Sequence, residues 1–107
     1  MKTAPQTGEV WFADTGYDAK PRYYLVMAVP GPGRLDLFSA IQITKQFGGT
    51  PFEVTLPRVP WLSEQSYINA QTIQPLLRPE FVRTAPGKFE LQVFRQVQAA
   101  LKLWLNL

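Results

Sequence analysis

Proline and glycine divide most of this chain into short pieces, and both residues are absent after Gly87. The ten prolines and seven glycines of the 107-residue sequence all lie between positions 5 and 87. Proline interrupts a β-ladder and glycine supplies turn conformations, so short segments between them are typical of strands joined by turns. The segment 88–107 has room for a long helix. We therefore expect a mostly-β chain that ends in an α-helix.

Short apolar or alternating runs predict the strands. Their ranges are 9–13, 23–29, 37–44, 52–56 and 66–73, the last with a break near Ala70. The segment 23–29 is almost entirely apolar, which predicts a strand that is buried on both faces. In 37–44 the alternation puts the even-numbered residues, including Gln42 and Thr44, on one face. Thr44 therefore ends a strand beside a glycine-rich turn.

The remaining segments complete a single predicted domain over residues 1–107. From position 90 or 91 to 105, apolar residues recur at helical spacing. They are Phe94, Val97, Leu101, Trp104 and Leu105. This stripe is expected to pack on the strands or on a partner subunit. The connection 57–65 is expected on the surface, and Glu53 is expected to point outward into solvent.

The absence of cysteine and histidine restricts the chemistry that is available. Without them the chain has no disulfide, no thiol nucleophile, no catalytic triad built on histidine and no thiolate or imidazole metal ligand. Any catalysis has to use arginine, lysine, tyrosine, hydroxyl groups or carboxylates. The net charge of +3 permits a nucleic acid or an acidic protein as partner but requires neither.

Targeting signals are not visible in the sequence. The first residues, MKTAP, have no apolar stretch after the lysine, so no secretory signal is expected. No apolar run approaches the roughly 20 residues that span a bilayer. We therefore expect a cytoplasmic protein with no membrane partner.

Several short motifs, taken in order, resemble the MazF/PemK family of toxins. They are GEVWFAD (8–14), KPRYYLV (20–26), IQIT (41–44) and PFEVTL (51–56), followed by Ser66, Gln71 and Gly87. The family pattern has an arginine directly before a hydrophobic strand and a later strand that ends in threonine. The matching positions here are Arg22 and Thr44. Together the motifs cover nearly the whole chain.

This resemblance implies a fold and a function. The fold is an SH3-like small barrel of the MazF/Kid/CcdB type, assembled as a homodimer. The function is that of a cytoplasmic toxin in a type II toxin–antitoxin system. Such a toxin is a metal-independent endoribonuclease that cleaves single-stranded RNA through attack by the 2′-hydroxyl. It uses no cofactor, and its expected protein partner is an acidic antitoxin.

Arg22 and Thr44 are the expected catalytic residues. Metal-free RNA cleavage needs the strand to be positioned and the phosphate charge to be neutralised. A guanidinium is always charged and presents a planar fork that matches phosphate oxygens. One such donor can contribute on the order of 3 kcal/mol to a transition state. The Thr44 hydroxyl can bond a phosphate oxygen or position Arg22.

Further residues are candidates for RNA binding. Lys20 and Lys45 flank the two catalytic positions and could attract phosphate. Aromatic rings in or beside loops can stack on unpaired bases. The rings are Tyr17, Tyr23, Phe47 and Trp61, and Gln71 matches the glutamine of the family pattern.

The chain also departs from the family pattern. Many members carry an acidic residue just before that glutamine, but here the position is Ala70. Tyr23 replaces the proline that usually follows the arginine. The general base is therefore unassigned, and two alternatives stay open. One is a barrel that binds RNA or protein without cleavage, and the other is a CcdB-like inhibitor of a protein target.

Overall fold

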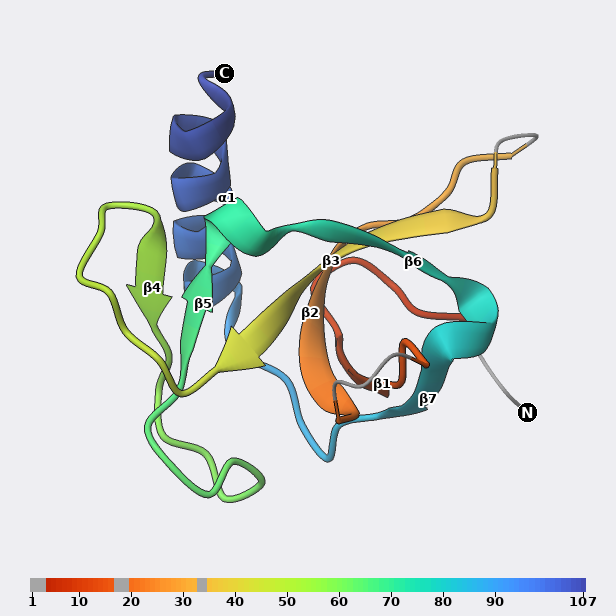
Figure 1. Ribbon diagram of the computed structural model, residues 1–107, viewed down its shortest axis with the longest axis horizontal. Helices are drawn as coiled ribbons and strands as arrows, with labels where there is room; N and C mark the ends of the chain where they lie inside the picture. Colours follow the sequence, from red (N-terminus) through yellow and green to blue (C-terminus); the bar gives the residue numbers. More distant parts are fainter. Residues whose placement is uncertain (1–3, 17–19, 33–34) are drawn as a thin grey trace.

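A seven-stranded antiparallel sheet makes up most of the molecule, and one α-helix packs against part of it (Figure 1). This computed structural model describes residues 4–16, 20–32 and 35–107. The strands are β1 (Val10–Ala13), β2 (Arg22–Ala28), β3 (Leu37–Thr44), β4 (Glu53–Thr55), β5 (Tyr67–Asn69), β6 (Gln74–Leu77) and β7 (Phe81–Thr84). Single turns of 3-10 helix, η1 (Ala70–Thr72) and η2 (Arg78–Glu80), precede β6 and β7, and α1 (Leu91–Leu105) ends the chain. The predicted mostly-β fold with a C-terminal helix is confirmed.

β3 is the strand that joins the two parts of the sheet. The strand order is β4-β5-β3-β2-β1-β7, and β6 also pairs with β3. The first part of β3 lies between β2 and β6, whereas its last residues, Ile43 and Thr44, pair with Ile68 and Tyr67 of β5. β3 therefore changes its neighbours along its length. Its C-terminal end lies where the two parts of the sheet separate (Figure 1).

Both faces of the central strands are buried. Tyr24 and Val26 belong to a first apolar cluster, here called the strand core, which consists of Trp11, Ala13, Tyr24, Val26, Phe38, Ala40, Leu76 and Phe81. Leu25 and Met27 belong to a second cluster, here called the helix-side core, which consists of Val10, Leu25, Met27, Ile41, Ile43, Leu56, Ile68, Phe89, Val93, Phe94 and Val97. Each large aliphatic side chain buried in this way contributes about 1.5–3 kcal/mol. The prediction of a doubly buried second strand is confirmed for residues 24–27.

The strands β6 and β7 were not predicted, and the expected strand 66–73 is largely wrong. Only Tyr67–Asn69 is extended, and η1 follows, with the break at Ala70 as expected. Pro75 lies in the next strand, β6, where a proline is unfavourable by propensity. It is tolerated because β6 pairs with β3 alone, opposite Ser39, so the missing N–H group needs no partner on the free side.

The connection 57–65 is less exposed than expected. Trp61 and Leu62 are half-buried and pack against the helix-side core. The Trp61 ring lies 5.5 Å from the ring of Phe89, measured between centroids. A surface position was therefore wrong for these two side chains. Apolar groups in a loop gain free energy by folding back over the core.

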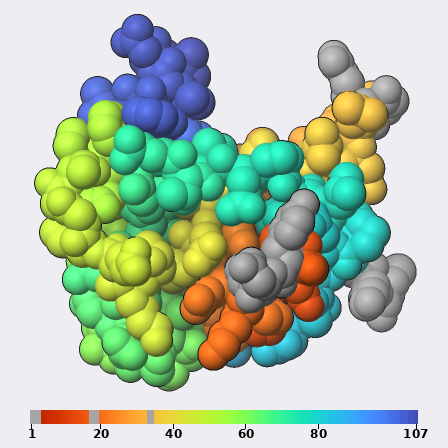
Figure 2. All heavy atoms as spheres, viewed as in Figure 1, coloured from red at the N-terminus to blue at the C-terminus, as the bar shows by residue number. Residues whose placement is uncertain are grey.

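Only the first part of α1 is covered by the sheet. Its buried residues are Val93, Phe94, Val97 and Ala100. The last turns project beyond the rest of the molecule (Figure 2). Trp104, the penultimate residue of α1, contacts Phe52 with 5.3 Å between ring centroids. Asn106 ends the helix in the left-handed region at φ 60°, and its N–H bonds the carbonyls of Leu103 and Lys102. Among the described residues, no helix is long and apolar enough to cross a membrane.

Candidate functional site

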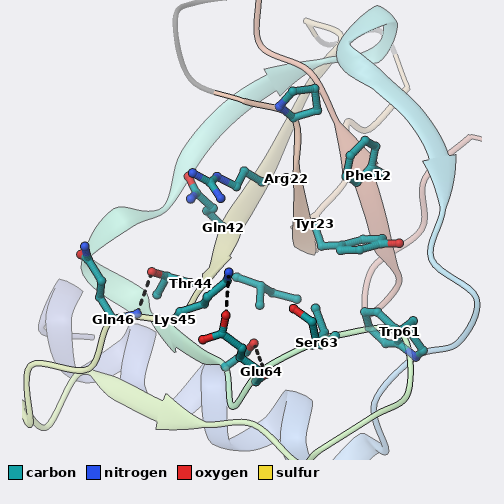
Figure 3. Close-up of a pocket in the computed structure, with 14 residues that line it drawn as sticks. Phe12, Arg22, Tyr23, Gln42, Thr44, Lys45, Gln46, Trp61, Ser63 and Glu64 are labelled. Carbon is teal, nitrogen blue, oxygen red and sulfur yellow. Dashed lines mark hydrogen bonds and ion pairs between the residues drawn. The ribbon is translucent and has the colours of Figure 1, made fainter.

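A cleft of about 480 Å³ opens where β2 and β3 part (Figure 3). Their pairing runs as far as Tyr24 and Gln42. Beyond that point β2 remains paired with β1 through Tyr23 and Arg22, whereas β3 continues beside β5. The two separating strands form the walls of the cleft. The connection between β4 and β5 supplies the remaining side, through residues 61–64 and Ser66.

Arg22 and Thr44 lie on opposite walls of this cleft. The last paired residues of β2 and β3 are Tyr24 and Gln42. If this antiparallel alignment is continued by two residues in each strand, Arg22 corresponds to Thr44. By strand alternation both share the face of Tyr24, which belongs to the strand core. The same face is therefore apolar in the middle of the sheet and polar at its open end. The prediction that one site contains both residues is consistent with this placement.

The guanidinium of Arg22 is available to a ligand. Arg22 is exposed, and no described carboxylate forms an ion pair with it. Its charge acts on its neighbour Tyr24, whose pKa is raised by burial and by Glu80 and lowered by Arg22. An unpaired guanidinium at the mouth of a cleft can bind a phosphate without first losing a protein partner.

The hydroxyl of Thr44 is held by the turn that follows β3. Its Oγ1 atom accepts a hydrogen bond from the backbone N–H of Gln46 at 3.1 Å. A hydroxyl that accepts one bond can still donate its own proton. Thr44 can therefore present a donor to an anionic oxygen in the cleft.

An ion pair lies beside these two residues. Lys45 Nζ is 3.1 Å from Glu64 Oε2, and both side chains are more than half exposed. An exposed pair of this kind stabilises the fold by about 1 kcal/mol at most. Of the described residues that line the cleft, Glu64 is the only one with a carboxylate.

Three aromatic rings also line the cleft. The Tyr23 ring contacts the rings of Phe12 and Trp61 edge-on, with centroids 5.1 and 5.2 Å away. All three are labelled in Figure 3. The guanidinium of Arg83 lies over the Phe12 ring at 4.2 Å. The cleft thus combines cationic and hydrogen-bonding groups with flat apolar surfaces.

The other predicted RNA-binding residues are not all in the cleft. Tyr23, Lys45 and Trp61 line it, whereas Lys20 and Gln71 do not. Tyr17 lies outside the described residues. Phe47 stacks on Tyr67, with 4.7 Å between ring centroids, and does not line the cleft either.

Ala70, at the place of the family's acidic residue, is completely buried in η1. Its N–H donates to the carbonyl of Phe52. Ala70 does not line the cleft of this monomer.

Five polar residues of the cleft were not predicted as site residues: Gln42, Gln46, Ser63, Glu64 and Ser66. Gln42 shares a face with Thr44, so the strand alternation could have indicated it. The other four lie in connections, where no periodicity marks the side that a residue faces.

Glu53 is not the simple solvated residue that was expected. Its carboxylate accepts hydrogen bonds from the N–H of Thr50 at 2.8 Å and the N–H of Gly48 at 2.9 Å. These backbone bonds, that of Thr50 first, hold the pKa of Glu53 below its ordinary value. Glu53 thereby fixes the loop that follows Gln46 at the rim of the cleft. Within residues 4–16, 20–32 and 35–107, acidic residues form no cluster that could hold a metal ion.

Solved structures of MazF toxins have the same fold as this chain. A mycobacterial endoribonuclease in complex with its cognate antitoxin matches with a TM-score of 0.77 and 24% identity, over 97% of each chain. MazF of Deinococcus radiodurans, in a MazE-MazF complex, matches with a TM-score of 0.74 and 26% identity over 99% of each chain. Mycobacterium tuberculosis MazF-mt6 matches with a TM-score of 0.74 and 18% identity, over 92% of this chain and 97% of that one.

Comparison of the sequence alone does not find this similarity to MazF toxins. No protein-family model matches the chain, and no curated protein matches its sequence. The resemblance that the ordered motifs predicted is nevertheless confirmed by the solved structures, and the chain has the MazF fold.

Proposed function

We propose that this chain, which has the fold of the MazF toxins, is an endoribonuclease that cleaves single-stranded RNA in the cleft between β2 and β3. The observation that carries the proposal is the placement of Arg22 and Thr44 on facing walls of one cleft. The reaction is attack by a 2′-hydroxyl on the adjacent phosphorus, which gives a 2′,3′-cyclic phosphate and a free 5′-hydroxyl. The nucleophile belongs to the RNA itself, so the protein has to position the strand and stabilise charge.

Each wall has its own task. Arg22 binds the scissile phosphate and stabilises the charge that grows on its oxygens in the transition state. Thr44 donates a hydrogen bond to the same phosphate from the opposite wall. Tyr23 and Trp61 offer ring surface to a neighbouring base. A base inside a duplex is already stacked, so this wall favours single-stranded RNA.

The similarity to MazF structures also bears on the biological role of the chain. Two of the similar structures are complexes of a toxin with its antitoxin. We propose that this chain likewise acts as the toxin of a type II toxin–antitoxin pair. It would form a homodimer and act on messenger RNA in the cytoplasm until an acidic antitoxin binds it.

The test is cleavage of a long single-stranded RNA by the purified protein in the presence of EDTA. We expect fragments with the wild type and about 100- to 1000-fold slower cleavage with Arg22→Ala, the effect of losing one donor to developing charge. Arg95→Ala is the matched control, because Arg95 is an exposed arginine on α1 that does not line the cleft. Its rate should equal that of the wild type.

Other outcomes would point to other functions. Intact RNA that nevertheless shifts on a native gel would indicate a binding module that has lost cleavage. If the RNA neither shifts nor breaks, the protein does not act on RNA, and a protein target of the CcdB type becomes the better hypothesis. Equal cleavage by wild type and Arg22→Ala would remove Arg22 from the reaction.

A further inference from the structure

The proposed cleavage needs a group that takes the proton from the attacking 2′-hydroxyl. Neither Arg22 nor Thr44 is suited to this, because a guanidinium stays protonated and an alcohol is a very weak base. We infer that Glu64 is this general base and that Lys45 positions it. The inference rests on the proposed ribonuclease function and adds a catalytic residue to it.

The position of Glu64 fits the role of a general base. It lines the same cleft as Arg22 and Thr44, although it comes from the connection between β4 and β5 (Figure 3). Lys45, its partner, directly follows Thr44 in the chain. The carboxylate is therefore tied to the residue next to the phosphate-binding hydroxyl.

The contact with Lys45 leaves part of the carboxylate free. Lys45 Nζ bonds Oε2, and no described residue donates a hydrogen bond to Oε1. Oε1 can therefore accept the proton of a ribose hydroxyl while Oε2 remains fixed. The charged or titratable groups that face Glu64 are Lys45, Arg22 and Tyr23 in the cleft.

Four other described carboxylates already accept hydrogen bonds from the protein itself. Glu53 accepts backbone N–H groups of its own loop, and Asp14 accepts the N–H of Gly16. Glu9 accepts the indole N–H of Trp11, and Glu80 accepts the N–H of Leu77. Glu64 differs from these because its side chain is held only by a flexible lysine.

The chemical step balances without a cofactor. The 2′-oxygen bonds to phosphorus as its proton passes to Glu64, and the bond from phosphorus to the 5′-oxygen breaks. The leaving 5′-oxygen takes a proton from water. The resulting hydroxide is neutralised by the proton on Glu64, which restores the carboxylate.

The experiment compares Glu64→Gln with wild type and with Glu90→Gln. Glu90 is an exposed glutamate outside the cleft, so it is the matched control. Cleavage under EDTA is followed across a pH series. We expect Glu64→Gln to be about 100-fold slower or more, the usual range for a lost general base. Its rate should also lose the fall at low pH that wild type and Glu90→Gln show.

Binding and leaving-group measurements separate this role from others. The affinity for RNA methylated at every 2′-oxygen, which cannot react, should change by less than about fivefold, because a glutamine retains the shape of the side chain. The second substrate is RNA in which sulfur replaces the bridging 5′-oxygen, because a thiolate leaves without a proton. The defect of Glu64→Gln should persist on it, since the attacking hydroxyl still has to be deprotonated.

Three results would overturn the inference. One is cleavage by Glu64→Gln at the wild-type rate. Another is full rescue by the sulfur substrate, which would assign Glu64 to the leaving group. The third is a fall at low pH in Glu64→Gln that equals the fall in wild type. If wild type cleaves RNA and Arg22→Ala does not, any of these results contradicts only the role of Glu64. If wild type itself does not cleave RNA, the proposed ribonuclease function is wrong.

Discussion

Arg22 of β2 and Thr44 of β3 line the same cleft, yet the backbone of Thr44 pairs with Tyr67 of the neighbouring strand β5. This change of partner separates the two side chains by a cleft instead of a packed ladder. Both walls remain attached to the sheet, because Arg22 pairs with Ala13 on its other side. Groups held on strands in this way need little rearrangement when a phosphate binds.

For RNA cleavage, the hydroxyl group of Thr44 should matter more than the volume of its side chain. Thr44→Val keeps the volume and removes the donor, so we expect cleavage to slow by about 10- to 100-fold, the value of a hydrogen bond to a charged group. Thr44→Ser should retain most of the activity. Thr55→Val, at an exposed threonine of β4, is the control. A Thr44→Val protein with normal cleavage would show that the hydroxyl does not touch the phosphate.

The two glutamines should behave differently. Gln42 lines the cleft and Gln71 does not. We expect Gln42→Ala to raise KM for a short RNA by about fivefold, as for one lost hydrogen bond of about 1 kcal/mol. Gln71→Ala should leave KM and kcat within twofold of wild type. The reverse order would mean that RNA follows a path other than this cleft.

Trp61 should contribute both to stability and to binding. Trp61→Ala removes its contacts with Phe89 and Tyr23. We expect a loss of about 2–3 kcal/mol in the free energy of unfolding, below the usual cost of a fully buried tryptophan. Affinity for 2′-methylated RNA should fall by about tenfold, as for one lost stacking surface.

Two further variants separate these effects. Trp61→Phe should recover most of the stability, and Trp104→Ala, whose ring lies outside the cleft, should not change RNA affinity. Both quantities come from urea unfolding and from fluorescence titration. Unchanged affinity in Trp61→Ala would exclude this ring from the binding surface.

Glu53 should make the stability of the protein depend on acid pH. Backbone hydrogen bonds from Thr50 and Gly48 lower the pKa of Glu53 in the folded state. A lowered pKa means that the charged form stabilises the fold above the ordinary glutamate pKa of about 4.3. That stabilisation is lost as the pH falls through the lower value of the folded state.

The check is urea unfolding of wild type and Glu53→Gln at a series of pH values. The difference in stability should be largest near neutral pH and should shrink below about pH 4. Glu90→Gln should run parallel to wild type. Parallel curves for Glu53→Gln as well would show that the bonds to the loop do not favour the ionised carboxylate.

Much of the fold was readable from local patterns. The alternation in 37–44, the apolar run in 23–29 and the helical spacing after Gly87 all correspond to β3, β2 and α1. These patterns record which face of an element is buried, a local property of the chain. β6 was not predicted, because proline at position 75 is unfavourable in a strand. The proline is tolerated only because β6 pairs with β3 alone.

The residues of the site also fall into those that the sequence indicated and those that only the structure revealed. Arg22 and Thr44 were chosen through the resemblance to the MazF/PemK motifs, and Trp61 was a candidate because its ring lies in a connection; all three line the cleft. Glu64 could not be chosen, since a connection carries no repeat that tells which way a side chain points. Its place beside β2 and β3 depends on how the loop between β4 and β5 folds back across the sheet. The amino-acid sequence thus determined most of the strands, the helix and the proposed pair Arg22 and Thr44, whereas the tertiary structure decided which distant side chains join that pair, because contacts between separate elements are set by packing and not by local spacing.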